Sequence, residues 1–251
     1  MFVKGITLWN FVNIISHIFT LFIMVKVCCF ALLLVSCIPK EKTEGTSAMI
    51  TQAVPAKSIQ YDSCKKAIRQ LKSKSSTQWK SLPTSQKQIC FTNAVVHTIL
   101  PAWYGTKWDY NGTTTKPQTG SIACGYFVTT VLRDAGLPIA RVKLAQCASA
   151  QMIKAIVKPP FIAEFSLQPL STFINYITLK GYGLYIVGLD NHTGFIYNDG
   201  EHIWFIHATY LGTADVQKEN AANSKILANS KYKMIGKISA DETLLNKWIQ
   251  Q

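Results

Sequence analysis

One segment of the chain, residues 192–207, has the pattern of a β-hairpin and constrains the fold more than any other stretch. Asp199-Gly200 lies between two alternating apolar runs. Asp-Gly at this place predicts a type I′ turn, because both central residues of that turn need positive φ. With a two-residue turn, His192 and His207 would lie directly opposite each other on one face of the sheet, with Cβ atoms ~4.5–5.5 Å apart.

A cysteine at the start of an expected helix is the second informative feature. Residues 121–135 carry an apolar stripe at helical spacing, and a Gly-x-Pro sequence directly after them ends the helix. Cys124 falls in the first turn, where the helix dipole and unpaired N–H groups lower the pKa of a thiol. His192 could act as its base and His207 as the group that orients this base. The backbone N–H of Cys124 could stabilise an oxyanion. The combination favours a thiol enzyme.

Each of these residues also has a structural interpretation. A single cysteine at a helix start is more often a small buried residue, and a single histidine on a strand is usually structural. A facing pair of histidines could also bind a metal, but no third ligand of suitable spacing stands out. We therefore expect neither a metal nor another cofactor.

The first 36 residues have the features of an export signal. They contain no acidic residue and only two basic ones, Lys4 and Lys26, and the sequence Leu-Val-Ser at 34–36 leads into Cys37. This box resembles a bacterial lipoprotein signal, in which the chain is cut before the cysteine and that cysteine is acylated. A membrane-spanning anchor is the alternative, but the apolar stretch after Lys26 is too short to cross ~30 Å of hydrocarbon. Met24 could be the true start.

The chain therefore divides into three expected parts. Residues 1–36 form the signal peptide, the polar residues 37–60 form a flexible tether, and residues 61–251 form one domain. We expect a protein of the bacterial cell envelope, attached to a membrane through a lipid on Cys37 and facing the periplasm or the exterior.

The formal net charge of +13 indicates anionic partners. In a bacterial envelope these include carboxylate-bearing peptide stems and anionic lipid headgroups. Nucleic acid fits less well as a partner, because the basic residues are dispersed and the chain carries an export signal.

Four cysteines remain after the expected signal and Cys37: Cys64, Cys90, Cys124 and Cys147. They contain no C-x-x-C pair, which argues against a structural zinc site. An oxidising compartment would allow a Cys64–Cys90 disulfide, which the sequence alone does not assign.

Helices precede an antiparallel sheet in the expected order of elements, which is the α+β pattern. The expected helices cover residues 62–74, 85–101, 121–135, 144–157, 170–180 and 241–250. The second of these would begin with a capping box of Ser85 and Gln88. The expected strands cover residues 183–189, 191–198, 202–208 and 232–239. We expect residues 211–230 to form a loop or a mobile insert.

The order of these motifs resembles the NlpC-type papain-like cell-wall endopeptidases over roughly residues 100–210. That family has a Gly-Thr-x-Tyr-x-Trp-Gly-Gly segment, an Asp-Cys-Ser-Gly motif opening a helix, a His-x-Gly-x-Tyr strand and a strand ending like Phe-x-His-Ala. The similar segments here are residues 105–112, 123–128, 192–197 and 205–208. The resemblance implies a papain-like fold with helices packed on an antiparallel sheet. It implies Cys124 as nucleophile, His192 as base and His207 as the orienting residue.

The same resemblance implies a cysteine peptidase or amidase that cuts peptide or amide bonds, with a peptidoglycan peptide or a similar amide as substrate. It places Trp108 where the family has a tyrosine near the oxyanion site. Tyr104 and Tyr110 are neighbours that could supply the missing hydroxyl in the substrate groove.

The chain departs from the family at Ala123, which replaces the aspartate before the nucleophile, and at Trp108. These departures motivate a second hypothesis, a catalytically silent envelope lipoprotein that binds cell-wall peptides or a partner protein through the same groove. A third hypothesis keeps the triad and changes the acceptor, giving an amidase or acyltransferase that acts on a lipid or another non-wall substrate.

Overall fold

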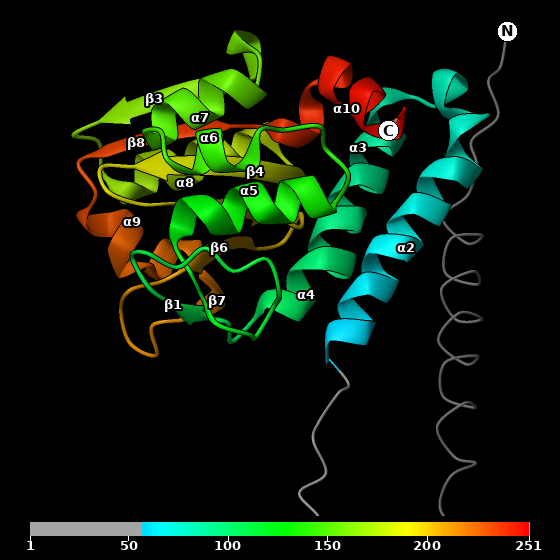
Figure 1. Ribbon diagram of the computed structural model, residues 1–251. Coiled ribbons are helices and arrows are strands. Elements are labelled where there is room, and N and C mark those ends of the chain that lie inside the picture. Colours follow the sequence, from blue (N-terminus) through cyan, green and yellow to red (C-terminus); the bar gives the residue numbers. More distant parts are fainter. Residues whose placement is uncertain (1–56, 251) are drawn as a thin grey trace, which may run out of the picture. The chain divides into compact units, whose positions relative to one another are not determined.

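A computed structural model describes residues 57–250, which form an α+β arrangement (Figure 1). The expected signal peptide, Cys37 and nearly all of the expected tether lie outside the described residues. Within residues 57–250, no helix combines the length and apolar character that crossing a membrane requires.

A six-stranded sheet forms the centre of the fold, with every neighbouring pair of strands antiparallel. Its strands are β3 (Ile162–Ser166), β4 (Gly183–Leu189), β5 (Thr193–Asn198), β6 (Ile203–Ala208), β7 (Val216–Asn220) and β8 (Tyr232–Gly236). Their spatial order is β3-β8-β4-β5-β6-β7. Strands β4 to β7 thus form a meander, and β8 returns to lie between β3 and β4. A separate parallel pair joins β1 (Lys107–Trp108) to β2 (Ser121–Ile122).

Helices cover both faces of this sheet. The α-helices are α2 (Lys57–Ser76), α3 (Thr84–Asn93), α4 (Leu100–Trp103), α5 (Cys124–Asp134), α6 (Arg141–Ala145), α7 (Ser149–Ile156), α8 (Leu170–Lys180), α9 (Lys225–Asn229) and α10 (Glu242–Ile249). A π-helical segment, Ala94–Ile99, joins α3 to α4, and short 3₁₀ turns cover Trp79–Ser81, Pro159–Phe161, Ala221–Asn223 and Ile238–Ala240. Figure 1 shows α5 and α7 in front of the sheet and α2 beside α3.

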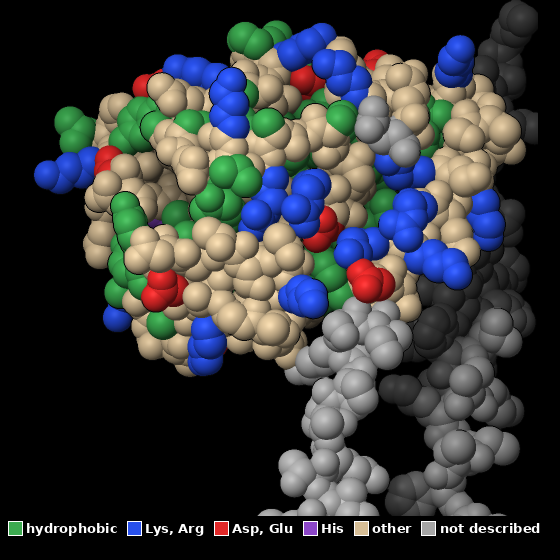
Figure 2. All heavy atoms as spheres, viewed as in Figure 1, with side chains coloured by type: hydrophobic (Ala, Val, Ile, Leu, Met, Phe, Trp, Pro, Cys, Tyr) green, Lys and Arg blue, Asp and Glu red, His purple; other side chains and the backbone are tan. Residues whose placement is uncertain are grey.

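Two hydrophobic clusters lie on the two faces of the sheet. The larger contains the apolar stripe of α5, including Phe127, together with Phe195 and Ile206 from the sheet. The smaller contains Phe173 of α8 and Phe205 of β6. Neighbouring strand residues alternate between the two clusters because a strand presents successive side chains to opposite faces. Outside the core, Lys and Arg side chains are spread over the face shown in Figure 2.

Several expected elements are present with small changes at their ends. The strand at 183–189 and the helix at 170–180 have the expected bounds, and Gly181 follows α8 with a φ of 72°. Helix α10 buries the four apolar side chains expected to face inward, namely Leu244, Leu245, Trp248 and Ile249. Helix α2 begins at Lys57, so the end of the expected tether is helical.

Other expectations are wrong. Helix α3 begins after Pro83 without a side-chain cap, so Ser85 and Gln88 form no capping box. The expected helix at 144–157 is broken into α6 and α7. The polar stretch at 211–230 contains β7 and α9, and the sequence does not predict strand β3. All four described cysteines are free, so Cys64 and Cys90 are not joined.

Candidate active site

Cys124 is the first residue of helix α5. The sequence predicts it within the first turn of a helix that begins at residue 121, but residues 121–122 form strand β2 instead. The residue before Cys124, Ala123, has the extended backbone that a helix start requires, with φ −78° and ψ 156°. The next residue, Gly125, needs to lack a side chain because α6 packs directly on this turn. A Cβ atom on Gly125 would lie 2.5 Å from the carbonyl oxygen of Ala145. The close approach of α6 forms one wall of the cavity into which Cys124 faces.

The histidine hairpin forms, but with a different register. Strand β5 pairs Asn198 with Ile203, so the turn contains four residues, 199–202, rather than two. The side chain of Asp199 accepts hydrogen bonds from the backbone N–H groups of Glu201, at 2.9 Å, and His202, at 2.7 Å. These bonds stabilise the wider loop. The sequence predicted that His192 and His207 lie directly opposite each other. In the structure they are offset instead.

The offset keeps the two imidazoles together. It moves the partner of each residue by two positions, and side chains two positions apart share a face. Nε2 of His192 lies 2.9 Å from Nδ1 of His207. Their residues are 5% and 0% exposed. The ring of His207 also stacks on Phe205, with centroids 3.8 Å apart and planes 11° apart.

A carboxylate that the sequence analysis missed continues this contact. Nε2 of His207 lies 3.2 Å from Oε1 of Glu219, within ion-pair distance although not aligned as a hydrogen bond. Glu219 lies on β7, where it pairs with Phe205 of β6. On edge strand β7 only Val216 is fully buried. The sequence of this strand therefore shows no alternation of apolar and polar residues that could have indicated Glu219.

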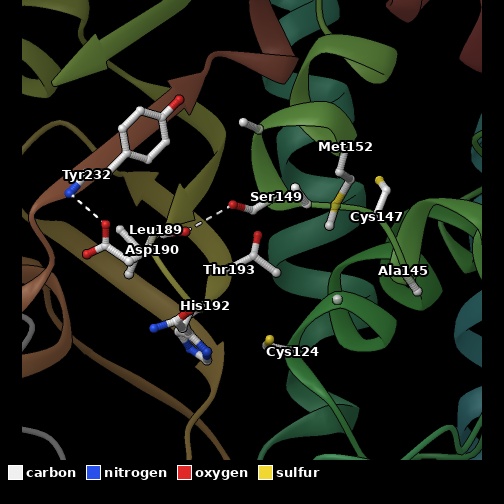
Figure 3. A pocket seen from close by; sticks show the side chains of 14 residues that line it. Cys124, Ala145, Cys147, Ser149, Met152, Leu189, Asp190, His192, Thr193 and Tyr232 are labelled. Carbon is white, nitrogen blue, oxygen red and sulfur yellow. Dashed lines mark hydrogen bonds between the residues drawn. The ribbon is translucent and has the colours of Figure 1, made fainter. Parts of the chain in front are cut away.

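Cys124 and His192 line one cavity of about 430 Å³. Figure 3 shows them at the same end of it, with Cys124 on the helix side and His192 on the strand side. His192 precedes β5, and the next residue, Thr193, directs its backbone N–H toward the sulfur of Cys124. Nδ1 of His192 is buried without a hydrogen-bond partner. The cavity is thus lined by a thiol and by a histidine whose Nδ1 forms no hydrogen bond.

Burial dominates the titration of these groups. It raises the pKa of the Cys124 thiol, although backbone N–H groups of Thr193, Gly125 and Cys124 itself oppose this. The N–H groups at the helix start thus lower this pKa as expected, but burial outweighs them and the pKa is raised overall. Burial, with a smaller contribution from His207, lowers the pKa of His192 to about 3. Burial also lowers the pKa of His207, against the opposing effect of Glu219. Near neutral pH the thiol and both imidazoles are uncharged.

The three expected groove aromatics lie elsewhere. Trp108, Tyr104 and Tyr110 do not line the cavity that Cys124 and His192 share. Tyr110 is 81% exposed, and burial raises the pKa of the half-buried Tyr104 to about 12. Trp108 packs on Tyr210, with ring centroids 5.9 Å apart, and Tyr210 in turn meets His192 edge to face at 5.6 Å. Tyr210, which the sequence did not indicate, is thus an aromatic ring beside His192.

No protein-family model, no curated protein and no solved structure matches the chain. Among residues 57–250, no group of three His, Cys, Asp or Glu side chains is arranged to hold a metal ion. The functional inference therefore depends on the site's geometry and on the motifs of the sequence.

Proposed function

We propose that the protein is a cysteine peptidase or amide hydrolase of the NlpC-type, papain-like class. In this proposal Cys124 is the nucleophile, His192 the base and His207 the residue that orients it. The observation that carries the proposal is the 2.9 Å contact between Nε2 of His192 and Nδ1 of His207, beside a cavity that Cys124 also lines.

One assignment of protons suits the thiol of Cys124, the two imidazoles and the carboxylate of Glu219. If Nε2 of His192 carries the proton, it donates to Nδ1 of His207, and Nδ1 of His192 stays free as a base. His207 then carries its own proton on Nε2, which faces Glu219. A third group that holds the other ring nitrogen is what a catalytic histidine needs to keep the correct tautomer.

The reaction follows from this assignment. As the sulfur of Cys124 bonds to the carbonyl carbon, the thiol proton passes to Nδ1 of His192. The oxyanion is stabilised by N–H groups at the start of α5, which have no partner within the helix. The protonated His192 then gives its proton to the amine as the C–N bond breaks. Water attacks the resulting thioester, a proton passes through His192 to the sulfur, and a carboxylic acid is released.

Peptidoglycan is the proposed substrate, by resemblance to the family. Cleavage before Cys37 would remove two basic residues, Lys4 and Lys26, and leave a net charge of +11, which favours approach to a wall polymer that carries carboxylates. The proposed lipid on Cys37 would hold the enzyme at the membrane beside that polymer.

Purified sacculi provide the test. We expect the wild-type protein to release soluble muropeptides, detected by mass spectrometry, and the variant Cys124→Ala to release none. Cys147→Ala is the matched control, because Cys147 lines the same cavity without opening α5, and it should retain release. Undiminished release by Cys124→Ala would refute the proposal. Products that carry a transferred acyl group instead of a new carboxylate would favour the acyltransferase hypothesis.

A further inference from the structure

A second cavity adjoins the first at His192. Its volume is about 270 Å³, and it shares the segment 189–192 with the first cavity. Its other walls come from Tyr210 and from helix α9, including Lys225. Cys124 lines the first cavity and not the second. The two cavities therefore meet at the proposed base, and only one of them contains the proposed nucleophile.

The chemistry of amide cleavage assigns a role to each cavity. The nucleophile bonds to the acyl carbon, so the acyl portion of the substrate must occupy the cavity that holds the sulfur. The base delivers its proton to the departing amine, so the amine portion must lie beside His192. The second cavity, which His192 lines without Cys124, is the place for the amine portion.

The acyl cavity contains no basic side chain that would attract a carboxylate. Most of its walls are small or apolar side chains, such as Ala145, Ala148 and Met152, and it contains no lysine or arginine. Its one acidic residue is Asp190, whose carboxylate accepts hydrogen bonds from the N–H of Lys231, at 2.7 Å, and of Tyr232, at 3.1 Å. Asp190 lines both cavities, but in the acyl cavity no cation would offset the cost of placing a second carboxylate beside it.

The amine cavity shares Asp190 with the acyl cavity and differs from it in containing a basic side chain, Lys225. Lys225 is exposed at its wall, and its ammonium group forms no ion pair or hydrogen bond within residues 57–250. Asn229 and Ser230 add polar side chains beside it. An unpaired cation at the rim of a cavity attracts an anionic group on whatever the cavity holds.

We propose that the substrate is an amide whose acyl portion carries no carboxylate and whose amine portion carries one, with Lys225 as the residue that selects the amine. This inference rests on the proposed function, since it assigns sides by the roles of Cys124 and His192. It narrows the substrate to bonds in which a neutral acyl residue is joined to the nitrogen of an amino acid with a free carboxylate.

Three small compounds test both halves of the proposal. The reference is N-acetyl-glutaminyl-alanine, compared with N-acetyl-glutamyl-alanine and with the C-terminal amide of the reference, each made with L and D residues at both positions. We expect Cys124-dependent cleavage of the reference, at least about tenfold slower cleavage of the glutamyl compound, and about two- to fivefold slower cleavage of the amide, as an exposed ion pair allows.

The variant Lys225→Met tests the second part of the proposal, that Lys225 selects a carboxylate on the amine portion. It should remove the preference for the free acid over the amide through a change in KM, whereas Lys231→Met should keep it, because Lys231 is also exposed but does not line the second cavity. A preference that survives Lys225→Met, or faster cleavage of the glutamyl compound, overturns the assignment. Enzyme that digests sacculi but cleaves none of the compounds overturns the assignment alone. Failure on both substrates overturns the proposed function as well.

Discussion

Gly194 leaves the space that the side chain of His207 occupies. A Cβ atom on Gly194 would lie 2.8 Å from the Cβ of His207 and 2.7 Å from a ring carbon of Phe205, on which His207 stacks. These separations are shorter than van der Waals contact allows. The glycine two positions after His192 is therefore a steric requirement of the histidine pair.

The variant Gly194→Ala should lose more catalytic activity than its reduced folding stability alone would explain. Overpacking at this position should cost about 1–3 kcal/mol of unfolding free energy, and displacement of His207 should break its contact with His192. Urea unfolding and muropeptide release measure the two effects. Gly200→Ala is the control: Gly200 has a φ of 103° and open space around it, so strain should destabilise that variant without loss of activity per folded molecule. Full activity in Gly194→Ala would contradict the proposed role of the pair.

Glu219 acts in our proposal as a positioning residue for His207. Glu219→Gln keeps the size of the side chain and removes its charge, so we expect kcat to fall while KM stays nearly constant. The fall should be smaller than the ~10⁴-fold loss known when the group bonded directly to a catalytic histidine is neutralised. Because Glu219 raises the pKa of His207, the variant should also lower that pKa, which NMR of the ring nitrogens would detect.

Glu201→Gln is the matched control for that experiment. Glu201 is exposed in the hairpin turn, so its variant should change neither kcat nor the titration of His207. Equal kinetics in Glu219→Gln and Glu201→Gln would show that the carboxylate has no part in the site.

Acid should destabilise the fold through His192. The pKa of this residue is about 3 in the folded protein against 6.5 without perturbation, so between these values only the unfolded chain binds the proton. The stabilising contribution of neutral His192 is complete above pH 6.5 and is lost as the pH falls toward 3. Thermal melts between pH 4 and 7 should therefore show a shallower decline in Tm for His192→Gln than for wild type. Parallel curves would indicate that His192 titrates normally.

Alkylation of Cys124 distinguishes the hypothesis of an enzyme from the hypothesis of a catalytically silent binding module. Burial raises the pKa of this thiol, so iodoacetamide should label it slowly at pH 6, in contrast to what the helix start alone predicts. At pH 8 we expect His192→Gln to slow labelling of Cys124, because the neutral imidazole is no longer present to accept the thiol proton as the C–S bond forms. Labelling of Cys147 in the same sample, followed by mass spectrometry, is the internal reference. Identical rates in wild type and variant would favour the silent module.

Local sequence determined much of the fold. Turn and cap residues with clear periodicity placed β4, α8 and α10, since glycine, proline and apolar spacing act within a few residues. The same signals placed Cys124 at the start of α5. They also placed His192 and His207 on one face, because the two-residue period of a strand preserves the face through any even shift of register.

Tertiary structure decided the rest. The hairpin register depends on how Asp199 bonds the turn, and an apolar pattern that repeats every two residues does not distinguish registers two residues apart. Glu219 joins His207 only because edge strand β7 pairs with β6. The pKa of Cys124 depends on burial by segments far away in the sequence, which outweighs the local effect of the helix start. Sequence alone determined which side chains share a face, whereas packing between distant segments decided which of them meet and in what protonation state.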